Sequence, residues 1–480
     1  MGSNQIIKGI LGYSISTWTN LFIGLLYVIV STRVLTPDVY GLITLFYTVA
    51  TVLMYVLSLG LDSAYIRYFN TPPRDNTKQQ MLYTCMLIST IVCFCAALFS
   101  VFLIPSVYSN VFGFFSRLLI GALFLYIYCQ LILRYLNITF RMSFKTLHYN
   151  IQNIVMNGVS KLIIVIAALI RNDFIFIISI LSIITAFVLI IYLFCQRKEY
   201  IPINSIGEKE YHLNLKGYWS FFRFALFSSP TYIVTYSNLY LGQQIVASNL
   251  GSYALGIFAS TSFFSQIIIS IRNGFATYWT AFVYKNYKRE RHVINKMHDY
   301  ILSISIIIVC ILALSRDFVY LFIGDNFHES KSFFSLMMIM PILGFVQETT
   351  DKGIFLAKKN EVVLAVSAFA LLTNVLVSVF LIDKFGLIGA AIGNASSALF
   401  TYIFSTLWGQ KFYKTTSSSL KSLIGIIIIV TILIIPSVFV EMYNIMLIVI
   451  SLFFLSIYFF LEEYSDMVKI VYAFIRRDRL

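Results

Sequence analysis

Two otherwise apolar segments of the chain carry polar side chains at helical spacing. The two stripes consist of Arg134, Asn137 and Arg141 in the first segment and Asn153, Asn157 and Lys161 in the second. Within each stripe the residues recur every three or four positions, so they share one face of a helix. Cations flanked by amide side chains can bind an anion, and we interpret Arg134 and Lys161 as an anion site. Arg141 lies nearer a segment end and is interpreted as an anchor at the membrane interface.

The alternative is that acceptor groups within the protein bind these cations. In that case Lys161 pairs with an acid inside another helix and Arg134 pairs with a backbone carbonyl. The first half of the chain offers few acids within helices, of which Asp62 is the main candidate. This scarcity favours the anion site.

A second cluster of charges lies within one apolar segment of the other half. Glu348 and Lys352 are four residues apart, in the order that favours an intrahelical ion pair, and Asp351 lies beside them. These residues form either a structural ion pair or a coupling-ion site. Arg272, on a different segment, is either a second anion contact or a partner of Glu348.

Aromatic residues with hydroxyl groups form a further stripe at Tyr232, Tyr236 and Tyr240. Their faces and hydroxyls suit sugar rings, and Tyr236 is the candidate contact. The alternative is ordinary packing, because the chain contains 32 tyrosines.

These residues lie on segments that are long enough and apolar enough to cross a membrane. Mean hydropathy is +0.84 and 12% of residues are charged, and a span needs about 20 apolar residues. We predict an all-α membrane protein with about fourteen transmembrane helices. The predicted spans are 11–32, 43–69, 81–105, 117–140, 149–170, 174–196, 218–242, 253–281, 299–323, 332–357, 361–382, 386–410, 421–440 and 443–462.

The basic residues fall mostly in alternate gaps between these spans. Of 35 basic residues, 29 lie on the side that holds the N-terminus and six lie on the other. The side rich in Lys and Arg is the cytoplasmic side. This distribution predicts a multi-pass protein with both termini in the cytoplasm. The net charge of +14 is therefore explained by topology rather than by nucleic-acid binding.

The longest gap divides the predicted spans into two groups. We predict a six-helix bundle at 1–196, a cytoplasmic linker at 197–217, a second six-helix bundle at 218–410, and two additional helices with a basic tail at 411–480. A faint repeat supports the two bundles, because Leu35, Gly41 and Leu42 align with Leu250, Gly256 and Ile257 at one constant offset. Both copies follow an odd-numbered helix, so the repeat is parallel, about an axis along the membrane normal.

Several features that an enzyme or a metal protein would need are absent from the sequence. The chain has no G-x-x-x-x-G-K-[ST] loop for ATP, and its six cysteines and five histidines form no metal-binding spacing. No predicted outward loop is large enough to build an active site. We therefore expect a transporter rather than an enzyme.

Four segments of the chain form a recognisable series, namely Arg33-Val-Leu-Thr-Pro-Asp-Val-Tyr-Gly41, Gly60-Leu-Asp-Ser-Ala-Tyr-Ile-Arg67-Tyr-Phe69, Gly251-Ser-Tyr-Ala-Leu-Gly-Ile-Phe-Ala259 and Phe385-Gly-Leu-Ile-Gly-Ala-Ala-Ile-Gly393. In sequence, order and spacing they resemble the polysaccharide flippases of the multidrug/oligosaccharidyl-lipid/polysaccharide exporter superfamily. The chain departs from the family at Gly242-Gln243, where many members carry an Asp-Arg pair.

The resemblance implies a flippase for undecaprenyl-pyrophosphate-linked oligosaccharides in the bacterial plasma membrane, which supplies O-antigen or capsule assembly. It would work by alternating access between the two bundles, with the last two helices peripheral. Membrane lipids, a polysaccharide polymerase and a chain-length regulator are the other partners expected. No cofactor is expected, and the sequence leaves open whether an H⁺ or Na⁺ gradient drives transport. The alternatives are a drug/cation antiporter of the same superfamily, which would need acids in the first bundle, and a membrane glycan polymerase.

Overall fold

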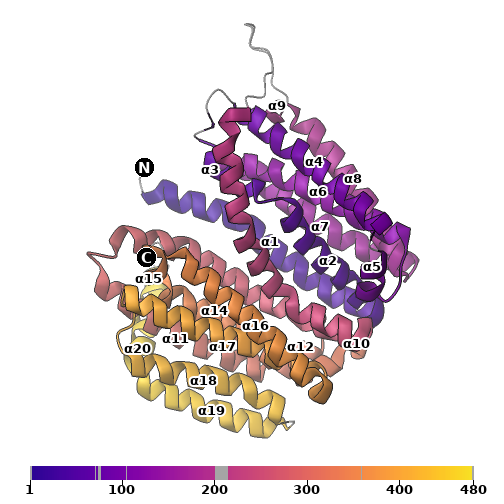
Figure 1. Cartoon of the computed structure of the whole chain (residues 1–480). Coiled ribbons are helices and arrows are strands. Elements are labelled where there is room, and N and C mark those ends of the chain that lie inside the picture. The colour runs from indigo at the N-terminus through magenta and orange to yellow at the C-terminus, as the bar shows by residue number, and fades with distance from the viewer. Residues whose placement is uncertain are drawn as a thin grey trace. The chain divides into compact units, whose positions relative to one another are not determined.

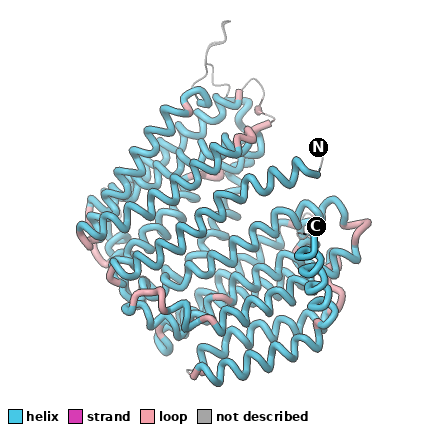
Figure 2. The backbone as a smooth tube through the Cα atoms, turned by 180° about the vertical axis from the view of Figure 1, so that it is seen from behind, coloured by secondary structure: helices cyan, strands magenta, loops and turns pink. Residues whose placement is uncertain are grey.

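The protein is helical throughout the part of the chain that the computed structural model describes, which comprises residues 3–70, 72–73, 77–103, 105–200, 215–357, 359–439 and 441–477. Figure 2 shows helices joined by short loops in these residues. The chain folds as two compact units, Met1–Gly256 and Ile257–Leu480.

The first unit contains nine helices and the beginning of a tenth among its described residues. They are α1 (Ser3–Val34), α2 (Pro37–Leu57), α3 (Leu61–Tyr68), α4 (Lys78–Leu103), α5 (Pro105–Phe112), α6 (Arg117–Met142), α7 (Thr146–Ile170), α8 (Phe174–Cys195), α9 (Arg197–Tyr200) and the first part of α10 (Leu215–Asn286). Helix α6 is central in this unit, since it packs against α2, α4, α7 and α8, and α1 packs along α7 (Figure 1).

The second unit holds the rest of α10 and the following helices. They are α11 (Arg291–Leu314), α12 (Arg316–Tyr320), the 3₁₀ helix η1 (Asp325–Ser332), α13 (Phe334–Met337), α14 (Ile339–Thr350), α15 (Lys352–Leu356), α16 (Asn360–Phe385), α17 (Leu387–Phe412), α18 (Ser419–Val438), α19 (Met442–Phe459) and α20 (Leu461–Arg477). Among the described helices of this unit, the antiparallel neighbours α16 and α17 pack together most extensively.

Local sequence signals account for several helix boundaries. Pro37 opens α2 at the position where its missing N–H costs no hydrogen bond. The Asp173 side chain caps α8 by accepting from the Phe176 backbone N–H at 2.9 Å. Gly386 separates α16 from α17 with a φ of 56°, and Gly251 interrupts α10 with a φ of 83°. Glycine tolerates such angles because it lacks a Cβ atom.

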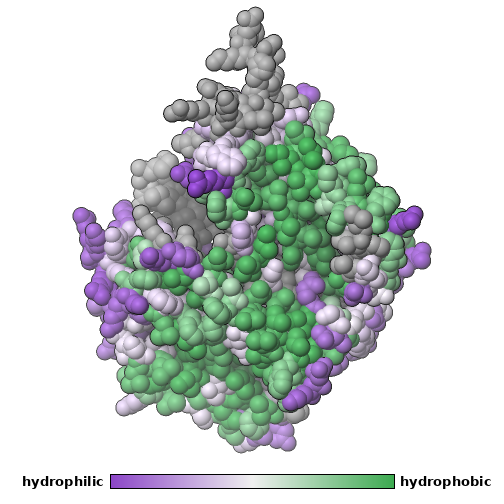
Figure 3. Space-filling model, in the orientation of Figure 1, coloured by the Kyte–Doolittle hydropathy of each residue, from purple (hydrophilic) through white to green (hydrophobic). Residues whose placement is uncertain are grey.

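Twelve of the described helices are long and apolar enough to span a membrane, and a bent pair would make a thirteenth. Large apolar side chains such as Phe102, Phe187 and Phe380 stay exposed on the outer faces of these helices. Figure 3 shows this apolar surface in green, with hydrophilic side chains gathered toward the helix ends. The chain is therefore a multi-pass membrane protein.

Three predicted spans differ from the helices in the structure. The predicted span 43–69 is divided, because Leu59 and Gly60 both adopt positive φ angles, of 50° and 72°, between α2 and α3. The predicted span 299–323 ends early, at Leu314. The predicted span 332–357 consists of three short helices, and the pair of helices from Asp325 to Thr350 is bent by 71°. Hydropathy averages over such breaks because it measures composition and not backbone direction.

The division into compact units falls later in the chain than the predicted linker at 197–217, much of which (201–214) lies outside the described residues. The predicted span 218–242 forms the start of α10 and packs within the first unit, where the Ala225 carbonyl faces Gly60. The four-part division at 196, 217 and 410 stays a prediction.

The last two long helices, α18 and α19, pack within the second unit. Both α18 and α19 pack against α11. The buried His298 on α11 bridges two other helices, with Nδ1 at 2.8 Å from Thr349 Oγ1 and Nε2 at 2.9 Å from Ser422 Oγ. These contacts join α14, α11 and α18 through one side chain.

Candidate substrate pocket

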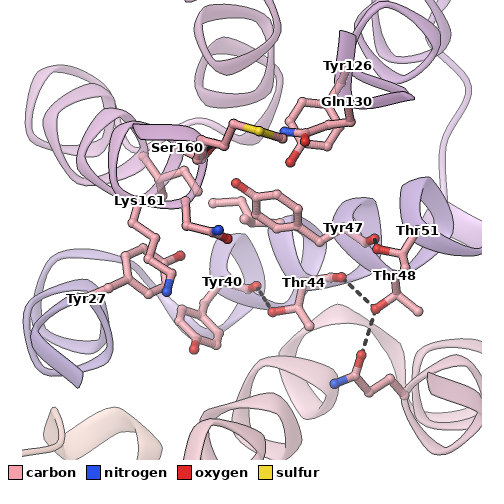
Figure 4. Close-up of a pocket in the computed structure, with 15 residues that line it drawn as sticks. Tyr27, Tyr40, Thr44, Tyr47, Thr48, Thr51, Tyr126, Gln130, Ser160 and Lys161 are labelled. Atoms are coloured by element: carbon pink, nitrogen blue, oxygen red, sulfur yellow. Dashed lines mark hydrogen bonds between the residues drawn. The ribbon is translucent and has the colours of Figure 1, made fainter. Parts of the chain in front are cut away.

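A pocket of about 400 Å³ lies within the first unit, between α1, α2, α6, α7 and the first part of α10 (Figure 4). Most of its lining side chains carry a hydroxyl, amide or amino group. The lining residues are Tyr27, Tyr40, Ile43, Thr44, Tyr47, Thr48, Thr51, Tyr126, Gln130, Met156, Asn157, Ser160, Lys161, Ile164 and Gln243.

Helix α2 supplies a polar wall of this pocket. Its lining residues recur every three or four positions, so they share one face. The hydroxyls of Thr44, Thr48 and Thr51 each donate to the carbonyl four residues earlier, at 2.7–2.9 Å. Thr48 Oγ1 also lies 2.7 Å from Gln243 Oε1, which links this wall to α10. The hydroxyls are thus satisfied in an apolar surrounding and keep lone pairs for a ligand.

Lys161 is the only charged residue among the side chains that line the pocket, and this lining includes no carboxylate. Its side chain extends from α7 toward Tyr27 (Figure 4). No salt bridge to Lys161 occurs within the described part of the chain. A lysine without a counter-ion inside a membrane is costly, and such groups mark substrate or ion pathways.

The position of Lys161 along α7 places its charge deep in the membrane. Nine residues separate it from Ile170, the last residue of the helix, which corresponds to about 14 Å. That depth is close to the middle of a hydrocarbon core of about 30 Å. The Lys161 side chain is too far from either helix end to reach the headgroups easily.

Close packing of two turns occurs near the end of the pocket where α2 begins. A Cβ atom on Gly41 would lie 1.9 Å from the Ser252 carbonyl oxygen, and one on Gly256 would lie 2.0 Å from the Pro37 carbonyl oxygen. Ser252 Oγ also donates to Asp38 Oδ1 at 2.9 Å. These residues belong to the two copies of the predicted repeat, and the contact is reciprocal. Glycine is required at both positions because any side chain would separate the backbones.

Arg134 pairs with a carboxylate, whereas the scarcity of acids in this half had favoured an anion site with Arg134 unpaired. Its Nε and Nη2 atoms donate to Asp62 Oδ2 at 3.1 and 2.7 Å. Nη1 donates to the Tyr55 hydroxyl at 3.0 Å. The Asp62 side chain is 5% exposed and that of Arg134 is 32% exposed, so the pair is open on the arginine side.

The three predicted asparagines occupy different surroundings. Asn157 lines the pocket with Lys161. Asn153 lies one turn away on α7, outside the lining, and its backbone carbonyl accepts from Asn157 Nδ2 at 2.9 Å. Asn137 Nδ2 donates to Gln152 Oε1 at 3.2 Å, so it joins α6 to α7. The side chain of Tyr236 lies outside the described residues.

The predicted charge cluster of the other half forms a neutral network in the second unit. Glu348 receives Arg272 Nε at 3.0 Å on Oε1 and Lys352 Nζ at 2.7 Å on Oε2. Asp351 Oδ1 lies 3.3 Å from the same ammonium group. Arg272 crosses α14 at Gly344, where a Cβ atom would lie 3.0 Å from its Nη1. Two cations and two acids therefore neutralise one another.

Sequence reasoning found Lys161 and Asn157 but missed the four tyrosines of the pocket. Tyr126 and Gln130 precede Arg134 at i−8 and i−4, and so extend its stripe toward the N-terminal end of α6. Tyr40, Thr44 and Thr48 show the same four-residue spacing on α2. These spacings were signals available in the sequence, although tyrosine is common throughout the chain.

Solved structures show which fold this is. A structure described as the lipid II flippase MurJ in an inward closed conformation is similar to 96% of this chain and 99% of its own, with a TM-score of 0.67 and 15% identity. An inward-facing multidrug resistance MATE family transporter of the MOP superfamily matches 82% of this chain and 94% of its own, with a TM-score of 0.57 and 18% identity. The chain thus has the fold of MOP superfamily transporters.

The family is identified by the sequence. Residues 6–281, more than half of the chain, match the family described as polysaccharide biosynthesis protein, and no curated protein matches. The chain belongs to this family. The family description links the chain to polysaccharide biosynthesis, and its fold is one that membrane transporters have.

Proposed function

We propose that this chain moves undecaprenyl-pyrophosphate-linked oligosaccharide repeat units across the bacterial plasma membrane, for O-antigen or capsule assembly, by alternating access. The observation that carries the proposal is Lys161, a cation that has no counter-ion among the described residues and lies in a pocket of tyrosine, amide and hydroxyl groups.

The chemistry of the pocket matches the two parts of such a substrate. A pyrophosphate carries at least two negative charges, and its attraction to a fixed ammonium group is stronger in a low-dielectric cavity than in water. Sugar rings present apolar faces and hydroxyls, which pair with the faces of Tyr27, Tyr40 and Tyr47 and with amides such as Gln130. Lys161 would hold the phosphate, and the tyrosines would hold the sugars.

The alternative functions need features that the lining lacks. A drug/cation antiporter would need a carboxylate to hold a cationic drug, and the pocket lining contains a cation instead. A polymerase would need an acid or base placed to activate a sugar hydroxyl, and no carboxylate or histidine is found among the lining residues.

The direction of transport depends on orientation, and we infer that both termini are cytoplasmic. The 29-to-6 distribution of basic residues supports this inference. Ser248 and Lys288 are exposed positions toward the two ends of one predicted span. In a cysteine-free background, Ser248→Cys should react with an impermeant thiol reagent on intact spheroplasts, and Lys288→Cys only after permeabilisation. The reverse labelling would overturn the orientation.

Translocation by the purified full chain in liposomes tests the proposed function. The probe is a polyprenyl-pyrophosphate disaccharide with a fluorophore on the sugar, quenched from outside by an impermeant reductant. Wild-type protein should make nearly all of the probe quenchable, whereas protein-free vesicles should protect the inner-leaflet half. Lys161→Ala should behave like protein-free vesicles, and Lys161→Arg should keep part of the activity because it retains the charge.

The matched control is Arg141→Ala, an exposed cation on α6 outside the pocket. It should translocate the probe like wild type. Normal translocation by Lys161→Ala would remove the pocket from the mechanism. Failure of the wild-type protein to move the probe, with uptake of a cationic dye instead, would favour the antiporter.

A further inference from the structure

We propose that Asp62, Arg134 and Tyr55 form a second anion station beside the pocket, in which Asp62 is a counter-ion that the substrate pyrophosphate displaces. This inference rests on the proposed function. It assigns the trio a role in passing the phosphate toward Lys161, which the proposed function does not require.

The trio lies directly beyond the pocket lining. On α2, Tyr55 follows the lining residue Thr51 by four positions, and on α6, Arg134 follows the lining residue Gln130 by four positions. Each step is one helical turn, or about 6 Å along the axis. In the predicted topology α2 and α6 run in the same direction, so both steps lead toward the cytoplasmic side. A phosphate that enters from the cytoplasm therefore meets Arg134 before Lys161.

The geometry of the pair leaves Arg134 able to accept a second anion. Both guanidinium contacts to Asp62 end on the same carboxylate oxygen, Oδ2, at 2.7 and 3.1 Å. This arrangement lacks the parallel two-oxygen pairing that makes arginine–carboxylate contacts strongest. About a third of the Arg134 side chain is exposed while Asp62 is buried. A pyrophosphate can accept hydrogen bonds from the Arg134 guanidinium group on two oxygens, and it can approach from the exposed side.

The backbone holds Asp62 in place independently of Arg134. Leu59 and Gly60 adopt left-handed conformations, with φ of 50° and 72°, and this break separates α3 from α2. A Cβ atom on Gly60 would lie 2.2 Å from the Ala225 carbonyl oxygen, so α10 fixes the break. Asp62 lies in the first turn of α3, where the helix dipole stabilises a carboxylate. Asp62 can therefore stay in position while its partner is released.

This arrangement gives Asp62 two effects on transport. In the empty protein Asp62 neutralises Arg134. Only an anion that binds the Arg134 guanidinium group more tightly than Asp62 does can then displace it. After the phosphate has bound, the nearby carboxylate repels it and competes for Arg134, which favours transfer to the ammonium group of Lys161. Asp62 is thus a positioning residue that weakens binding at the first station and speeds departure from it.

The test measures binding of farnesyl pyrophosphate to the purified full chain by calorimetry, together with translocation in the liposome assay. Asp62→Asn should lower the Kd by about tenfold, since removing a competing charge is worth on the order of one decade in affinity. Both the KM and the maximal rate of translocation should fall, because the phosphate leaves Arg134 more slowly. Asp62→Glu, which keeps the carboxylate, should have the Kd, KM and maximal rate of the wild type. A merely structural Asp62 would instead give weaker binding and a lower unfolding temperature in Asp62→Asn.

A second variant tests the station without removing the acid. Arg134→Lys keeps a cation for Asp62 but loses the planar guanidinium group that can donate to two phosphate oxygens. It should raise the Kd by about tenfold. The control is Glu199→Gln, which breaks the Lys145–Glu199 pair outside the pocket and should leave the Kd unchanged. Wild-type binding with an unchanged or raised Kd in Asp62→Asn would overturn this inference alone. No binding of the probe by the wild-type chain would overturn the proposed function.

Discussion

The two units of the chain each bury lysine within apolar helices, but they treat its charge differently. In the second unit Lys352 is 6% exposed and contacts both Glu348 and Asp351. In the first unit Lys161 is half-buried beside tyrosines and has no ion-pair partner among the described residues. The charge of Lys352 is neutralised by the protein. Among the described residues that of Lys161 has no such partner, so a ligand or solvent in the pocket must neutralise it.

This difference separates a structural charge from a functional one. Arg272, Glu348, Asp351 and Lys352 connect α10, α14 and α15 without net charge, and removing one member leaves the others unpaired. Lys161 joins no such network among the described residues, so its charge lowers the stability of the folded protein. A burden of this kind is expected where a group serves binding rather than stability.

The largest expected effect is on stability, from Lys352→Met. The substitution leaves Glu348 with Arg272 alone and Asp351 with no cation within contact. Breaking a buried ion pair by removing one partner costs about 3–5 kcal/mol. We expect a much lower thermal unfolding midpoint in detergent and less folded protein in the membrane.

A charge-balanced variant sharpens this expectation. Lys352→Met combined with Asp351→Asn removes one charge of each sign, keeps the Arg272–Glu348 pair and should recover part of the lost stability. An unchanged midpoint in the single variant would mean that the second-unit cluster is not a structural network. Lys352 and Lys161 would then not differ in their contribution to stability.

The smallest expected effect on stability comes from the same substitution in the first unit. Lys161→Met removes a cation that has no ion-pair partner in the described part of the chain, and replaces it with an apolar side chain of similar length. The unfolding midpoint should stay the same or rise, by a free energy of up to about 1 kcal/mol, although translocation is lost. A fall in the midpoint as large as that for Lys352→Met would show that Lys161 is structural.

Much of the fold could be predicted from hydropathy, and the exceptions share one cause. Spans such as 117–140 and 174–196 lie within two residues of the observed ends of α6 and α8. The breaks at Leu59 and within 332–357 were not predicted. They depend on contacts with distant segments, such as the Ala225 carbonyl beside Gly60, and a hydropathy window contains no information on such contacts.

The candidate site could be predicted only along single helices. The stripe that contains Asn157 and Lys161 follows from spacing on α7, and both residues line the pocket. The partner of Arg134 lies 72 positions away, and the choice between Asp62 and a carbonyl depended on how α3 is turned. Tyr27 reaches the pocket from α1, and no local pattern distinguishes it from tyrosines that pack elsewhere.

The reciprocal packing of Gly41 and Gly256 bears on how the chain arose. Gly41 meets the Ser252 carbonyl and Gly256 meets the Pro37 carbonyl, with the same separation of 215 residues between equivalent positions. Contacts of this reciprocal kind are those that two identical subunits make around a twofold axis. One such segment would satisfy both sides of the contact with a second copy of itself. The contact is therefore what gene duplication and fusion would leave behind if the ancestor were a half-length chain that worked as a homodimer.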